Sequence, residues 1–70
     1  MGGAEMSEVH SSQHPHQLQI ASARHQRGLT VPQAAALIYV APFDWREWED
    51  GSKPMPWGLW ELFLIKTASL

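Results

Sequence analysis

All four tryptophans of the chain lie within one sixteen-residue window, as Trp45, Trp48, Trp57 and Trp60. Aromatic rings of this size bury large areas and dominate the energetics of a small core. The chain has 70 residues and no cysteine, so neither a disulfide nor a thiolate metal site can supplement that core. We therefore expect one small domain whose packing is densest around these tryptophans and which is stabilised by helix packing or by self-association.

The composition and the apolar periodicity of the N-terminal part of the chain change near Pro15. Residues 1–14 combine Gly, Ser, Glu and His with almost no apolar periodicity, which predicts a flexible, disordered tail. Beyond Pro15, apolar residues recur at helical spacing as far as Gly28, which predicts a first helix over 16–26. Because the sequence has no long alternating apolar and polar run, the expected fold class is all-α.

Proline and capping residues mark the starts of three further helices. Thr30 and Gln33 have the spacing of a capping box, in which each side chain accepts a hydrogen bond from the backbone of the other residue. Pro42 and Pro56 stand where a proline fits the first turn of a helix. The helices that these signals predict cover about 31–39, 42–50 and 56–67.

The last expected helix is apolar on nearly all sides. Such a helix is either enclosed in a core or presented to a partner. Three other short helices cover little of it, which favours a partner, and the size of the chain makes a homodimer plausible. Trp57, Trp60 and Leu64 are the candidates for this dimer seam or docking patch.

Charge gives the chain no general attraction to phosphates, because seven acidic residues oppose five basic ones. The helix expected at 42–50 has Arg46 as its only base against four acids. The apolar runs are too short to span a membrane, and the N-terminus lacks a basic region followed by an apolar one. We expect a cytoplasmic protein without a membrane segment, whose nucleic-acid contacts would come from a local patch.

Four short motifs stand in a fixed order along the middle of the chain. They are RGLT at 27–30, the pair Ala34 and Ala35, Val40, and WEDG at 48–51. In this order the sequence resembles the helix-turn-helix family of phage repressors, Cro proteins and xenobiotic-response-type regulators. The segment SKPMP, followed by LWELFLIKT, is similar to small regulators of plasmids and other mobile elements. The resemblance covers residues 18–66 and implies a lambda-repressor-like domain over 15–70.

In that family an arginine of the first helix pairs with a glutamate near the end of the recognition helix. The matching positions are Arg24 and Glu49. A fork-shaped guanidinium and a carboxylate can pin together two helices that meet at a steep angle. The chain departs from the family at Tyr39, where a glycine is common in the turn, and at Val31, where many relatives have glutamine.

The resemblance also implies which residues contact DNA. The helix expected at 31–39 would be the scanning helix, and the helix at 42–50 would enter the major groove of double-stranded DNA. Arg46 can contact guanine, Phe43 a thymine methyl, and Glu47 a cytosine amino group. The full set of expected DNA-binding residues is Thr30, Gln33, Pro42, Phe43, Arg46, Glu47 and Lys53.

Two functions are compatible with these residues. The first is a sequence-specific transcription regulator, a repressor that acts as a dimer by covering its promoter. The second is a protein-interaction module or inhibitor on the same scaffold, which the acidic helix at 42–50 favours. No pairing of nucleophile and base predicts an enzyme or a small-molecule substrate, and no cofactor is expected. The histidines lack the fixed spacing of a metal site; they are His10, His14, His16 and His25.

Overall fold

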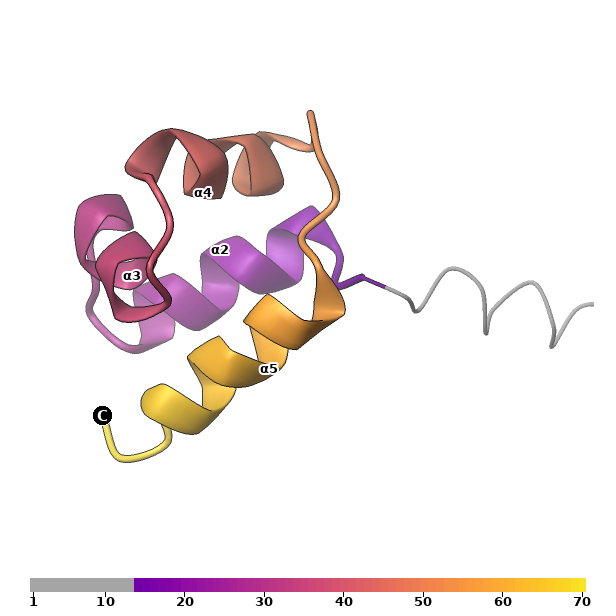
Figure 1. Cartoon of the computed structure of the whole chain (residues 1–70). Coiled ribbons are helices and arrows are strands. Elements are labelled where there is room, and N and C mark those ends of the chain that lie inside the picture. Colours follow the sequence, from indigo (N-terminus) through magenta and orange to yellow (C-terminus); the bar gives the residue numbers. More distant parts are fainter. Residues whose placement is uncertain (1–13) are drawn as a thin grey trace, which may run out of the picture.

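A computed structural model describes residues 14–70, which fold into four helices and contain no strand. The helices cover Gln17–Gln26 (α2), Val31–Leu37 (α3), Pro42–Asp50 (α4) and Trp57–Lys66 (α5). The predicted all-α class is therefore confirmed. Figure 1 shows α4 and α5 on opposite sides of the domain, with α2 between them. Of the predicted tail, all but residue 14 lies outside the described residues.

The start of α2 is fixed by a cap that the sequence did not reveal. The Nδ1 atom of His16 accepts a hydrogen bond from the backbone N–H of Leu18, and the Gln19 side chain accepts one from the backbone N–H of His16. These are the reciprocal contacts of a capping box, with histidine in place of serine or threonine. At the other end, Gly28 follows α2 with a φ of 68°, a conformation that favours glycine.

Helix α3 is shorter than expected. The predicted capping box is present, since Thr30 and Gln33 each accept a hydrogen bond from the other's backbone. However, α3 ends at Leu37 instead of residue 39, because Tyr39 has a φ of 64°. The backbone N–H of Val40 instead bonds to the carbonyl of Ala35, which closes the helix. The expected turn is thus made by a tyrosine in the left-handed region that usually favours glycine.

Helix α4 runs from Pro42 to Asp50, as predicted. A non-helical turn separates it from α3, so the two are separate helices. Figure 1 shows them meeting at a steep angle. Gly51 ends α4 with a φ of 85°, and the side chain of Gln17 lies where a Cβ atom would project. The backbone conformation therefore favours glycine here, whereas the flexible end of the Gln17 side chain could move aside for a Cβ atom.

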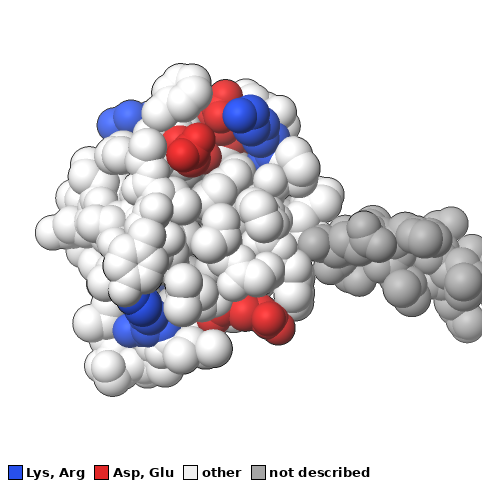
Figure 2. Space-filling view, in the orientation of Figure 1, with Lys and Arg blue, Asp and Glu red and all other residues white. Residues whose placement is uncertain are grey.

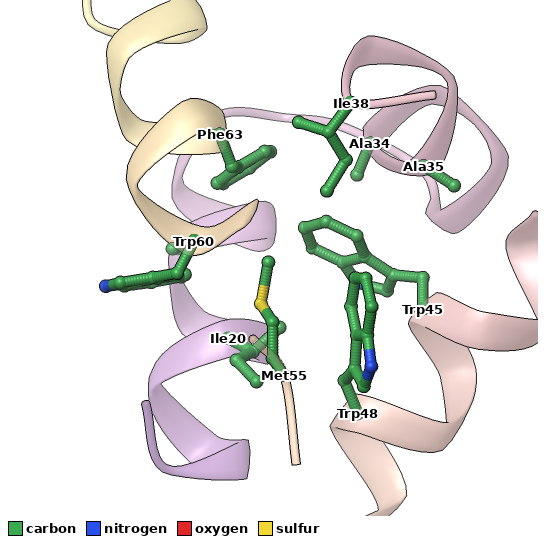
Figure 3. Packing of buried hydrophobic residues seen from close by; sticks show 10 residues of the cluster. Ile20, Ala34, Ala35, Ile38, Trp45, Trp48, Met55, Trp60 and Phe63 are labelled. Carbon is green, nitrogen blue, oxygen red and sulfur yellow. The ribbon is translucent and has the colours of Figure 1, made fainter. Parts of the chain in front are cut away.

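The core forms where all four helices meet (Figure 3). Trp45 lies at its centre, fully buried, and its ring meets that of Phe63 edge-on, with 4.9 Å between the centroids. Ala34 and Ala35 are completely covered, which lets α3 approach closely. Met55, in the loop before α5, is also fully buried and fills the gap between Trp48 and Trp60. A flexible thioether suits such an irregular gap.

None of the helices in residues 14–70 is long and apolar enough to cross a membrane.

Candidate nucleic-acid interface

Helix α4 has one buried face and one face open to solvent. Its inner face consists of Trp45 and Trp48, which are both buried and lie with ring centroids 5.6 Å apart. Each indole removes a large apolar area from water, so rotation of α4 about its axis would expose the core. Of the two residues between these anchors, Arg46 is exposed, whereas the Glu47 side chain is mostly covered. The inner face thus fixes which side chains reach solvent.

An ion pair joins the end of α4 to α2. The Nε of Arg24 donates to Glu49 Oε2 over 2.6 Å, and its Nη2 donates to Glu49 Oε1 over 3.0 Å. Arg24 Nη1 also donates to the carbonyl of Leu29, and Trp45 Nε1 donates to Glu49 Oε2. Both charged side chains are at least 85% covered. The two-pronged pair expected between Arg24 and Glu49 is therefore present, with the indole N–H of Trp45 as an unexpected third member.

These contacts shift the pKa of both partners. Burial raises the pKa of Glu49, but hydrogen bonds from Arg24 and Trp45 lower it by more, so the net shift is downward. The hydrogen bond to Glu49 raises the pKa of Arg24 against the opposing effect of burial. Both groups are therefore held in their charged forms, and neither charge is available to a ligand.

The outer face of α4 presents Phe43 and Arg46. Phe43 is 64% exposed although it is a large apolar side chain, and Arg46 is exposed one turn later. Positions three apart on a helix are neighbours, so the ring and the guanidinium share one surface. Pro42, also expected at this surface, is only half-buried and begins the helix.

Glu47 and Lys53 were each expected to contact DNA, but in the structure their side chains contact each other. The Lys53 Nζ lies 3.3 Å from Glu47 Oε1, and the Glu47 side chain is 19% exposed. The backbone N–H of Lys53 also bonds to the Glu47 carbonyl, which folds the loop after α4 onto the helix. Lys53 is consequently engaged with a carboxylate, and a phosphate would have to compete for it.

The four acidic residues of α4 repel phosphates less than their number suggests, because two of them are paired with basic side chains. Glu49 is neutralised by Arg24 and Glu47 by Lys53, which leaves Asp44 and Asp50 to oppose Arg46. Asp50 accepts hydrogen bonds from the backbone and hydroxyl of Ser52, which lower its pKa. Figure 2 shows red and blue side chains gathered together at the α4 edge of the domain, next to a largely uncharged face.

The expected phosphate contacts at the start of α3 are partly occupied. Thr30 and Gln33 are exposed, but each uses its side-chain oxygen to cap α3. The Thr30 hydroxyl hydrogen and the Gln33 amide hydrogens remain as the donors of this pair.

A contact at the α3–α4 turn was not anticipated from the sequence. The Nζ of Lys66 donates to the Tyr39 hydroxyl over 2.6 Å and lies 4.1 Å from the centre of the ring. This hydrogen bond lowers the pKa of Tyr39. The end of α5 is thereby tied to the turn that positions α4. No sequence signal links these two residues, because they lie 27 positions apart.

The three residues of the predicted dimer or partner patch on α5 differ in exposure, and the patch itself stays a prediction. Trp60 is only 8% exposed and stacks beside Phe63, with 6.2 Å between ring centroids, so most of its surface is used within the domain. Trp57 is exposed and Leu64 is half-buried. The sequence could not distinguish these positions, because α5 is apolar on nearly every side.

The sequence matches no model of a known protein family and no curated protein.

Within residues 14–70, no group of three or more His, Asp or Glu side chains lies close enough to hold a metal ion. His10, one of the four histidines considered for such a site, falls outside this range.

Proposed function

We propose that the protein is a sequence-specific DNA-binding transcription regulator whose α4 enters the major groove of double-stranded DNA. The observation that carries this proposal is the two-sided character of α4. Its inner face is fixed by Trp45 and Trp48, and its outer face offers Phe43 and Arg46 side by side. A rigid helix that presents a few outward side chains is the element that reads base edges in helix-turn-helix proteins.

Arg46 and Phe43 divide the reading of the bases between them. A guanidinium can donate two hydrogen bonds to O6 and N7 of guanine, and this is the commonest specific contact in the major groove. The ring of Phe43 can pack on the methyl group of a thymine beside that guanine. Asp44 and Asp50 oppose phosphates, so electrostatic affinity is low and the base contacts contribute a large share of the binding energy.

The mechanism that follows is repression by occlusion. Two protomers would place their α4 helices in successive major grooves, about one helical turn apart, and so cover a promoter. Two protomers that each bind DNA weakly bind it more tightly when joined than either does alone, because the second binding event becomes intramolecular.

The test is a fluorescence anisotropy titration with the duplex upstream of the gene and with a shuffled duplex, at about 50 mM and about 200 mM salt. The informative variant is Arg46→Ala, and the control is Lys53→Ala, which removes the same charge from the loop after α4. We expect Lys53→Ala to weaken binding to both duplexes about equally, and Arg46→Ala to lose about tenfold or more of the preference for the upstream duplex. An equal loss of preference in the two variants would contradict the assignment of α4.

One observation favours a second function, that of a protein-interaction module. Four of the five basic side chains contact another side chain of the same domain, two of them at its surface: Arg24 with Glu49, Arg27 with Thr67, Lys53 with Glu47 and Lys66 with Tyr39. In addition, an exposed aromatic ring and an arginine are typical of protein-binding hot spots. If no duplex binds at the lower salt concentration and a protein partner protects Phe43, this second function replaces the first.

A further inference from the structure

A groove runs between α2 and α5, on the side of the domain away from α4. Its volume is about 440 Å³, and it is open to solvent along its length. Eight residues line it: Leu18, Gln19, Ser22, Ala23, Gln26 and Arg27 from α2 and its C-terminal cap, and Trp60 and Leu64 from α5. Trp60 is largely buried behind the groove and provides a rigid wall.

The groove has no charge available to a ligand. Its one charged lining residue is Arg27, whose Nε donates to Thr67 Oγ1 over 2.7 Å and whose Nη1 donates to the Ala23 carbonyl over 2.9 Å. Its guanidinium also lies over the Phe63 ring, 5.5 Å from the centroid. Every other lining side chain is apolar or carries an uncharged amide or hydroxyl. An uncharged surface does not repel a second copy of itself.

Leu18 forms a projection directly beside this groove. It belongs to the groove lining and yet is 69% exposed, so most of this leucine at the edge of the groove is open to solvent. A projection next to a recess of the same chemistry is self-complementary across a two-fold axis, because each copy can insert its projection into the recess of the other. The contact of Leu18 with the groove of the other copy is then made twice, and it buries no unpaired charge.

We propose that a second copy of this chain closes the groove, with Leu18 of each protomer seated between α2 and α5 of its partner. The size of the domain supports this, since a core of so few large side chains gains from covering further apolar surface. The inference deepens the proposed function, because α4 lies on the opposite side from α5 and stays free in both protomers (Figure 1).

The first test measures the mass of the full chain by sedimentation equilibrium, without DNA, from about 1 µM to about 1 mM. The informative variant is Leu18→Glu. The control is Ile65→Glu, which places the same charge at an equally exposed apolar position on α5 outside the groove lining. We expect wild type and Ile65→Glu to dimerise with similar dissociation constants. Leu18→Glu should raise that constant more than about tenfold, because its carboxylate would be buried without a partner.

A second test identifies the surface directly. The chain contains no cysteine, so a single introduced cysteine is unambiguous. Ser22 lies at the middle of the α2 side of the groove, where two copies related by the two-fold axis approach each other, and Gln33 is exposed on α3. Ser22→Cys should form a disulfide-linked dimer on oxidation far faster than Gln33→Cys.

Three results would overturn this inference: a monomer throughout the concentration range, equal weakening by Leu18→Glu and Ile65→Glu, or equal cross-linking of the two cysteine variants. Circular dichroism verifies that each variant is folded, and both substituted apolar side chains are already exposed. Because no DNA is present, failure here leaves DNA binding by α4 to be decided by its own titration.

Discussion

Replacement of Glu49 by alanine is expected to destabilise the domain more than any other single charge removal. In the structure Glu49 accepts two hydrogen bonds from Arg24 and one from the buried indole of Trp45. Glu49→Ala leaves a mostly covered guanidinium with only its contacts to Leu29 and His25, and leaves the Trp45 N–H in the core without an acceptor. Unpaired buried donors cost far more than a lost surface contact.

The magnitude follows from those partners. An unsatisfied buried N–H costs about 1–3 kcal/mol, and breaking a well-covered ion pair costs about 3–5 kcal/mol. Since both side chains of the pair retain some exposure, we expect a total of about 2–4 kcal/mol. A domain of this length has an unfolding free energy of roughly 3–9 kcal/mol, so the variant loses a large fraction of it. The assay is urea unfolding followed by tryptophan fluorescence and circular dichroism.

The double variant Arg24→Met/Glu49→Leu is the matched control. It removes both charges together and puts apolar side chains in their place, which is often close to neutral. We therefore expect the double variant to be more stable than Glu49→Ala alone. A loss of less than about 0.5 kcal/mol for Glu49→Ala, as for an exposed ion pair, would refute the reasoning.

Three further predictions concern stability. Burial raises the pKa of Glu49, but hydrogen bonds from Arg24 and Trp45 lower it by more, so the folded-state pKa lies below the unfolded-state pKa of about 4.3. The stability that the ionised Glu49 contributes above about pH 4.3 is therefore lost as the pH falls through the folded-state pKa. Glu49→Gln should reduce this loss of melting temperature at acid pH. Tyr39→Gly should melt about 2–5 °C higher than Tyr39→Ala, because both variants lose the contact with Lys66 and only glycine adopts the positive φ without strain. His16→Ala should cost about 1 kcal/mol in urea unfolding and His16→Asn much less, since only asparagine keeps a capping acceptor; equal losses would show that the cap contributes nothing.

Local signals in the sequence predicted the ends of the helices correctly where proline, glycine or capping residues allow only one position for them. Helix α4 begins at Pro42 and is ended by Gly51, as expected, and Thr30 with Gln33 caps α3. These signals act within a few residues and need no knowledge of the fold. The early end of α3 was missed because Tyr39 has a side chain that normally disfavours the conformation it adopts.

The rest depended on contacts between residues that are distant in sequence or on small differences in exposure. Met55 lies in a loop between prolines, and nothing in that loop predicts that it fills the core. The contact of Lys53 with Glu47 depends on how the loop after α4 folds back. The different exposures of Trp57 and Trp60 depend on how α5 is rotated against α2, which a helix apolar on nearly every side leaves open.

The proposed function requires the outer face of α4 to contact the bases of a DNA duplex. Its most direct test is a nuclear magnetic resonance titration of the ¹⁵N-labelled chain with the duplex upstream of the gene. We expect the largest chemical-shift changes on the amides of residues 43–47 and on the Arg46 side chain. Changes confined to α5, or no change at the lowest salt concentration, would contradict it.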